Sequence, residues 1–272
     1  FDWHTLLRNY SDATPEEVSV IGNNSIKVLE HLLLDRHNGA SVINNITRAR
    51  ENARAVQDHI TKEVWQCLND YYHLIREKSV HQQITNGDPV TALDSLVHHG
   101  MLYHGIVDVT MARGEGFNYL NIGKFLERAV LSVDMLNIKL TELQYNLQQP
   151  VDVPALRYLL YSLSGYELYL KTHRGNFSAD HVLQQVLYND NFPHSVSYCL
   201  RQLLRYFERL QPESLPESYK QLEFLIGRTM NSVKYSSVNT ADSNGFRQFL
   251  LQIRQELVAI AAALNQYYFG HS

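Results

Sequence analysis

Residues 116–146, GFNYLNIGKFLERAVLSVDMLNIKLTELQYN, decide the fold class of this sequence. Apolar side chains recur along this stretch at intervals of three and four residues, which is the spacing of a helix that buries one face. The apolar stripe consists of Ile122, Phe125, Leu126, Ala129, Val133, Leu136 and Leu140. The pattern therefore predicts one long, core-facing helix over 116–146.

The same periodicity continues through the rest of the chain. Glycines and prolines are few, and prolines stand where helices begin, as in Thr14-Pro15-Glu16-Glu17, Asp88-Pro89 and Leu215-Pro216-Glu217. No run of residues reads as a strand. We predict an all-α, up-and-down helical bundle assembly of about nine helices without a significant sheet. The predicted helices cover residues 25–35, 40–78, 89–111, 116–146, 153–171, 179–188, 194–210, 216–235 and 243–269.

Two places in this pattern suggest breaks. The helix over 40–78 is expected to be kinked or split, because Thr61 could cap a second helix within it. Gln148–Asp152 is the best hinge between an N-terminal and a C-terminal bundle. Since this hinge is short and not of low complexity, we predict one composite domain over 1–272, with 1–147 and 152–272 as sub-bundles.

Composition excludes several classes of protein. Hydrophobic residues make up 44% of the chain and charged residues 19%, as in ordinary globular proteins. Charges sum to 24 − 28 = −4, so no overall basic field attracts nucleic acid or an anionic membrane. The longest apolar run, Leu257–Leu264, falls far short of the ~20 residues that a membrane-spanning helix needs. Cys67 and Cys199 lie in apolar helical patterns and are predicted to be core thiols of a cytoplasmic protein.

Motifs of known catalytic chemistry are missing from the sequence. It has no phosphate-binding glycine loop, dinucleotide fingerprint, nucleophile elbow or paired-cysteine zinc spacing, so we predict no cofactor and no metal. His98, His99 and His104 crowd one predicted helix, but His99 and His104 are five residues apart and face different sides. We interpret these histidines as hydrogen-bonded or surface residues rather than ligands.

Two groups of charged residues interrupt the apolar pattern. In the first, Glu51, Arg54, Asp58 and Lys62 step by three or four residues and would form one charged ridge, with Arg48, Asn52 and His59 beside it. This ridge is either a solvated ladder of weak ion pairs or part of a binding site. In the second group, Glu127 and Asp134 share a helix face and Arg128 flanks the apolar stripe.

Charges so close to a packing face must be paired or must meet a ligand. Arginine would supply a fork suited to carboxylate or phosphate. We further predict that helix 40–78 packs against helix 116–146 and brings the two charged groups within ion-pair reach. The candidate binding residues are Arg48, Glu51, Asn52, Arg54, Asp58, Glu115, Glu127, Arg128 and Asp134, and none is assigned a catalytic role.

Several sequence blocks, in order and over nearly the whole chain, resemble the bacterial alpha-E family. The Glu127-Arg128 pair is similar to the element from which that family takes its name. The blocks are Ser41–Ile43, Ala49–Arg54, Glu63–Trp65, Leu68-Asn69, Thr110–Phe117, Gly123–Ala129, Ser164, Glu167, Tyr169, Arg174-Gly175, Phe192–Val196 and Cys199-Leu200. Two departures stand out. A family helix bearing another Glu-Arg element would be expected before Phe1, and Gly39 replaces a proline that is common in the block Asp35–Ser41.

The resemblance implies a bacterial helical domain that accompanies a circularly permuted ATP-grasp ligase and a transglutaminase-like peptidase. That context suggests ATP-dependent formation of amide or peptide bonds. The chain would then be an accessory component that presents a peptide or small amine substrate. Two alternatives remain open: an enzyme using Arg54, Asp58, Glu127 and Arg128, and a purely structural scaffold.

Overall fold

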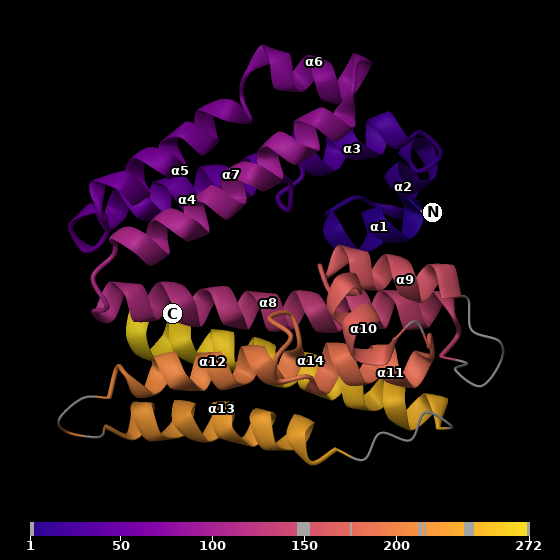
Figure 1. Cartoon of the computed structure of the whole chain (residues 1–272). Helices are drawn as coiled ribbons and strands as arrows, with labels where there is room; N and C mark the ends of the chain where they lie inside the picture. Colours follow the sequence, from indigo (N-terminus) through magenta and orange to yellow (C-terminus); the bar gives the residue numbers. More distant parts are fainter. Residues whose placement is uncertain are drawn as a thin grey trace. The chain divides into compact units, whose positions relative to one another are not determined.

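The computed structural model describes residues 3–145, 153–174, 176–211, 214, 216–236 and 242–270. Of these residues 79% are helical and none lies in a strand, which confirms the all-α class (Figure 1). This part of the chain contains 14 α-helices rather than about nine. The difference arises because two long predicted helices are split and three short helices were not predicted.

The chain divides by its internal contacts into two compact units, 1–117 and 118–272. We call them unit 1 and unit 2. The hinge expected at Gln148–Asp152 lies outside the described residues, so sub-bundles that meet there stay a prediction.

Unit 1 is built on α5, which packs against both α4 and α7. Ile43, Ile75 and Ile84 are fully buried between these helices and α6, and a smaller apolar cluster joins α1, α2 and α3. The helices are α1 (Trp3–Tyr10), α2 (Pro15–Ile21), α3 (Ser25–Leu33), α4 (Val42–Ala55), α5 (Lys62–Leu74), α6 (Lys78–Asn86) and α7 (Pro89–Thr110). Helices α1, α2 and α6 are two turns long or a little more, which is too short for periodicity to reveal.

The segment predicted as one helix over 40–78 is split, as Thr61 suggested. Helix α4 ends at Ala55, a single 3-10 turn covers Gln57–His59, and α5 begins at Lys62. The Thr61 hydroxyl accepts a hydrogen bond from the Val64 amide and so caps α5. The predicted proline starts are also present, since Thr14 forms a capping box for α2 and Asp88 caps α7.

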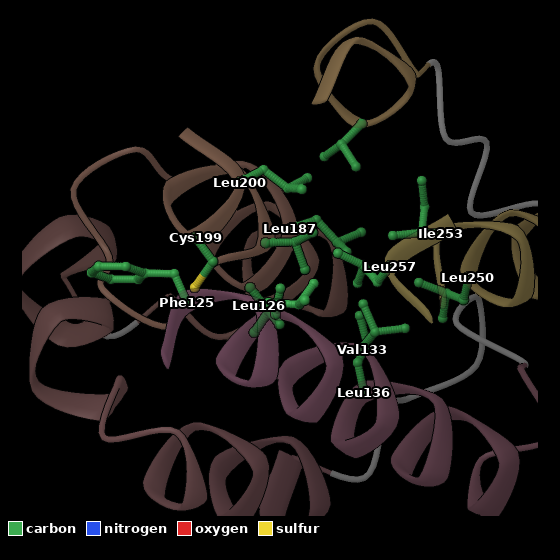
Figure 2. Close-up of a cluster of buried hydrophobic side chains, with 14 of the residues drawn as sticks. Phe125, Leu126, Val133, Leu136, Leu187, Cys199, Leu200, Leu250, Ile253 and Leu257 are labelled. Atoms are coloured by element: carbon green, nitrogen blue, oxygen red, sulfur yellow. The ribbon is translucent and has the colours of Figure 1, made fainter. Parts of the chain in front are cut away.

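Unit 2 surrounds the long helix α8 (Glu115–Glu142), whose first three residues belong to unit 1. All seven residues of the predicted stripe are buried, and Figure 2 shows Leu126, Val133 and Leu136 facing side chains of other helices. The other helices are α9 (Val153–Ser162), α10 (Tyr166–His173), α11 (Ala179–Leu183), α12 (Val196–Glu208), α13 (Glu217–Lys234) and α14 (Ser243–Leu264). Helices α12 and α13 lie side by side, as do α13 and α14.

The predicted helix over 153–171 is divided at Ser164-Gly165. Ser164 takes a left-handed backbone conformation (φ 54°) that ends α9, and Gly165 then precedes α10. A Cβ atom on Gly165 would lie 2.6 Å from the Phe192 ring and 2.8 Å from the Gln185 amide nitrogen. The glycine therefore permits a close approach to the segment after α11, where the backbone forms a π-helical turn over Gln184–Tyr188.

Candidate functional site

The charged residues predicted on α4 lie on its solvent-exposed face. Arg48, Asn52 and Arg54 are exposed, and the Glu51 carboxylate lies 2.8 Å from Arg50 and 3.9 Å from Arg54. Such exposed pairs contribute little to stability. The geometry within unit 1 is that of a solvated ladder of ion pairs.

The continuous ridge from Glu51 to Lys62 was predicted wrongly. Because α4 ends at Ala55, Asp58 lies in the 3-10 turn and Lys62 in the next helix, so the four residues do not share one helix face. Asp58 is exposed. A helical spacing continued across an unrecognised helix end produced the error.

Arg50, which was not among the candidates, makes the main polar contact between α4 and α5. Its Nε donates a hydrogen bond of 2.8 Å to the Asn69 side-chain oxygen, and its guanidinium lies 4.5 Å from the centroid of the Tyr72 ring. The Arg76 guanidinium lies 4.2 Å from the centroid of the same ring. Arg50 is therefore a structural link between the two helices.

On α8, the charged candidates separate from one another. Glu115 is the first residue of the helix and is exposed, as is Glu127. Asp134 pairs with Arg254 on α14, with distances of 2.6 Å from Nε to Oδ1 and 3.3 Å from Nη2 to Oδ2. The pairing expected near the packing face is thus present for Asp134, but its partner comes from a helix 120 residues away in sequence.

Arg128, the arginine of the Glu-Arg pair, binds the backbone of a distant loop. Its Nη1 donates to the Pro193 carbonyl at 3.3 Å, and its guanidinium lies 5.5 Å from the centroid of the Phe125 ring. The Cys199 thiol donates to the same carbonyl at 3.5 Å. A carbonyl oxygen has two lone pairs, so it can accept both donors.

We call residues 189–195, between the π-helical turn and α12, the anchored loop. Ser132, a fully buried serine on α8 next to Val133 of the apolar stripe, donates to the His194 carbonyl at 2.7 Å. Ser195 donates through its hydroxyl to the Asn189 carbonyl at 2.6 Å, and Arg201 donates to the Asp190 carbonyl at 2.6 Å. Four carbonyls of the anchored loop are therefore held by side chains, so its conformation is fixed.

The pKa values of His194 and Cys199, which lie beside Arg128, make them a poor general acid and a poor nucleophile at neutral pH. Burial, assisted by the charge of Arg128, lowers the pKa of His194 to about 4, so the imidazole is neutral at pH 7. Burial raises the pKa of the Cys199 thiol to about 12 although Arg128 acts in the opposite direction. Figure 2 shows Cys199 among apolar side chains of α8 and α12. A thiol held protonated in this way is chemically inert.

Glu127, Arg128 and Asp134 belong to unit 2, and the remaining candidates belong to unit 1. Their expected convergence, and the packing of 40–78 against 116–146 that would produce it, stay predictions. Glu127 is exposed, and it forms no ion pair with Arg128 in the described residues.

Beside the anchored loop lies a cavity of about 380 Å³, which the sequence did not reveal. Its walls come from the π-helical turn, the anchored loop, α12 and α13. The lining residues are Tyr188, Asp190, Ser197, Arg201, Leu204, Arg205, Glu208, Met230 and Lys234. In the sequence, only the family-like block Phe192–Val196 pointed to this region, and it gave no link to Arg128.

A second cavity of about 390 Å³ lies in unit 1 beside α3 and α6. It contains His31, whose Nδ1 is 2.9 Å from the Asp35 carboxylate, together with Lys27, Glu30 and His81. Within the described ranges, no group of three or more His, Cys, Asp or Glu side chains is placed to hold a metal ion. His98 and His99 contact backbone carbonyls of their own helix, as predicted.

No helix of the described chain has both the length and the apolar character needed to cross a membrane. No solved structure matches the chain. Uncharacterised proteins of Mycobacterium bovis and of Mycobacterium tuberculosis strain CDC 1551 are each 24% identical to it over 175 residues, which is 63% of this chain and 20% of the relative. The chain thus spans about a fifth of the length of these relatives.

Residues 1–269 match the family described as a predicted alpha-helical domain with a conserved ER motif. In this chain the Glu-Arg dipeptide on α8 is Glu127-Arg128, whose arginine fixes the anchored loop. The chain belongs to the Alpha-E family.

Proposed function

We propose that this chain is a non-catalytic helical component that binds a substrate for an ATP-dependent amide-forming ligase of the circularly permuted ATP-grasp class. One observation carries the proposal: Arg128 is used to fix the anchored loop, which forms one wall of a cavity. The motif arginine thus serves to shape a binding surface.

The chemistry of the surrounding groups supports a role in binding. The Cys199 thiol stays protonated, Asp134 is paired with Arg254, and His194 is a weak base. A general base works best with a pKa near the operating pH, which is far above that of His194. The cavity beside these groups has a volume in the range of small-ligand sites.

The family resemblance supports the choice of partner. It implies an ATP-grasp ligase and a transglutaminase-like peptidase in the same cytoplasmic system, with a peptide or small amine as substrate. A binding component of this kind needs no nucleotide motif of its own, since the ligase supplies ATP chemistry.

The direct test is co-purification of this chain with the ATP-grasp ligase encoded in the same genome. ATP turnover and amide formation should then be assayed with the ligase alone, with this chain alone and with both. We expect activity with the ligase, enhanced several-fold by the chain, and none with the chain alone. Substrate turnover by the chain alone would favour the enzyme alternative, and a complex without any change in activity would favour the scaffold.

A matched pair of variants sharpens this test. Arg128→Ala should reduce the enhancement because the anchored loop loses a contact, whereas Glu127→Ala, one residue away and exposed, should retain it. Full enhancement by a folded Arg128→Ala chain would contradict the role proposed for this arginine.

A further inference from the structure

The cavity beside the anchored loop contains an uneven set of charges. Arg201, Arg205 and Lys234 contribute three cations, and Asp190 and Glu208 contribute two carboxylates. Both signs are therefore present, with one positive charge in excess.

Arg201 and Asp190 neutralise each other. The Arg201 Nη1 lies 3.3 Å from the Asp190 carboxylate, while Nη2 donates to the Asp190 carbonyl. These two contacts hold Arg201 against the anchored loop. The charge that remains for a ligand comes from Arg205 and Lys234, opposed only by Glu208.

Arg205 is the group best placed to bind a ligand. It is exposed on α12, one turn after Arg201, and in the described part of the chain it has no hydrogen-bond or ion-pair partner. The Lys234 ammonium, from α13, lies 5.1 Å from the centroid of the Tyr235 ring. A free guanidinium presents a planar fork of donors that matches a carboxylate.

The uncharged lining residues are Tyr188, Ser197, Leu204 and Met230, so this part of the wall is mostly apolar. Leu204 and Met230 are half-buried, and the Tyr188 hydroxyl is hydrogen-bonded to Ser236 at 2.8 Å. The cavity therefore offers a flexible methionine and a leucine beside its cations, a surface against which a small apolar group of a ligand can pack.

We infer that this cavity binds a ligand with a single carboxylate and a neighbouring small apolar group, such as the carboxyl-terminal residue of a peptide. A monoanion matches the single excess charge, whereas a phosphate dianion would carry one negative charge more than the cavity can balance. The inference rests on the proposed function for the ligand's role in ligation, and it specifies the class of substrate.

The test uses the full chain and N-acetyl-L-leucine as the probe, with binding measured by calorimetry or by amide chemical shifts. N-acetyl-L-leucinamide, which lacks the carboxylate, and inorganic phosphate serve as comparison ligands. We expect the acid to bind at least tenfold more tightly than either. Equal binding of the amide, or tighter binding of phosphate, would overturn the inference.

Variants locate the site. Arg205→Gln should weaken binding of the acid at least tenfold and leave the melting temperature unchanged, because the side chain is exposed. Arg209→Gln is the matched control: Arg209 caps the C-terminal end of α12, one turn after Arg205, and lies over the Tyr206 ring outside the cavity, so binding should persist. Undiminished binding by Arg205→Gln would refute the site.

This measurement does not involve the ligase, so the two proposals can fail separately. If the chain binds and stimulates the ligase but does not bind the acid, the carboxylate site alone is wrong. If the acid binds through Arg205 but the chain has no effect on the ligase, the proposed function alone is wrong.

Discussion

At the scale of single residues, the two members of the Glu127-Arg128 pair behave differently. Glu127 is exposed to solvent, while Arg128 is half-buried and contacts Pro193 and Phe125. A hydrogen bond from an arginine to a carbonyl stabilises the fold more than a neutral one because the donor is charged, and the stability lost on its removal rises with burial. Within this pair, Arg128 is therefore the residue with a structural role.

The first prediction follows from that asymmetry. Arg128→Ala should destabilise the chain by about 1–3 kcal/mol, because it removes a charge-assisted hydrogen bond and the packing over Phe125. Glu127→Ala should change stability by less than about 0.5 kcal/mol, as for other surface substitutions. Urea unfolding of both variants provides the comparison, and equal losses would contradict it.

The second prediction concerns pH and His194. The folded pKa of about 4 lies below the value of roughly 6.5 expected for an unfolded chain. Between these values the unfolded state binds a proton that the folded state does not. The free energy of unfolding should therefore fall as the pH drops from about 6.5 to about 4, by about 1–3 kcal/mol after allowance for partial exposure.

Removal of this histidine should flatten that dependence. His194→Asn is expected to lose less stability than the wild type between pH 7 and pH 4.5, as measured by chemical denaturation. The control is His98→Asn, an exposed histidine on α7, which should keep the wild-type slope. An unchanged slope in His194→Asn would assign the acid sensitivity to other groups.

At the scale of helices and loops, the junction between α9 and α10 depends on a close backbone approach. The Gln185 side chain, which is buried, donates to the Gly165 carbonyl at 2.6 Å. Phe192, in the middle of the anchored loop, lies so close to the same glycine that a Cβ atom there would be 2.6 Å from its ring. The anchored loop is thus packed against this junction as well as against α8.

The third prediction tests this approach. Gly165→Ala should cost about 1–3 kcal/mol, because the added methyl group would overlap Phe192 and Gln185 unless they shift. Gly227→Ala is the control within helix α13, where an added methyl group meets nothing within 4 Å. It should be neutral or stabilise by up to about 1 kcal/mol through higher helix propensity. Thermal unfolding of the two variants tests whether the added methyl group destabilises the protein only at position 165.

What the sequence could reveal depended on whether the signal was local. The α8 stripe, the Thr61 cap and the proline starts are local patterns, and each is present in the structure. The contacts of Arg128 with Pro193 and of Asp134 with Arg254 join residues 65 and 120 positions apart, and no local pattern encodes them. The cavity was missed for the same reason, since its walls converge only after folding.

At the scale of the whole molecule, each unit has a hydrophobic core of its own. Ile84 is fully buried in the core of unit 1, and Leu136 is fully buried in that of unit 2. Local unfolding in proteins occurs in cooperative groups that follow such cores.

The fourth prediction is that core damage stays within its unit. Leu136→Ala and Ile84→Ala should each cost about 2–5 kcal/mol. Amide hydrogen exchange should accelerate most in the core helices of the unit that carries the substitution. Equal acceleration in both units after either substitution would show that they open as one cooperative body.

The two cysteines can serve as intrinsic probes of local unfolding, one in each unit. Cys67 lies in unit 1 and Cys199 in unit 2, and both are buried and free of disulfide bonds. A thiol reagent in solution can reach either sulfur only when the surrounding helices separate. The rate at which each cysteine is modified therefore reports how often its own unit opens. Both rates can be read from a single sample by mass spectrometry, with no introduced label. A ligand bound beside α12 should lower the rate at which Cys199 is modified and leave the rate at Cys67 unchanged.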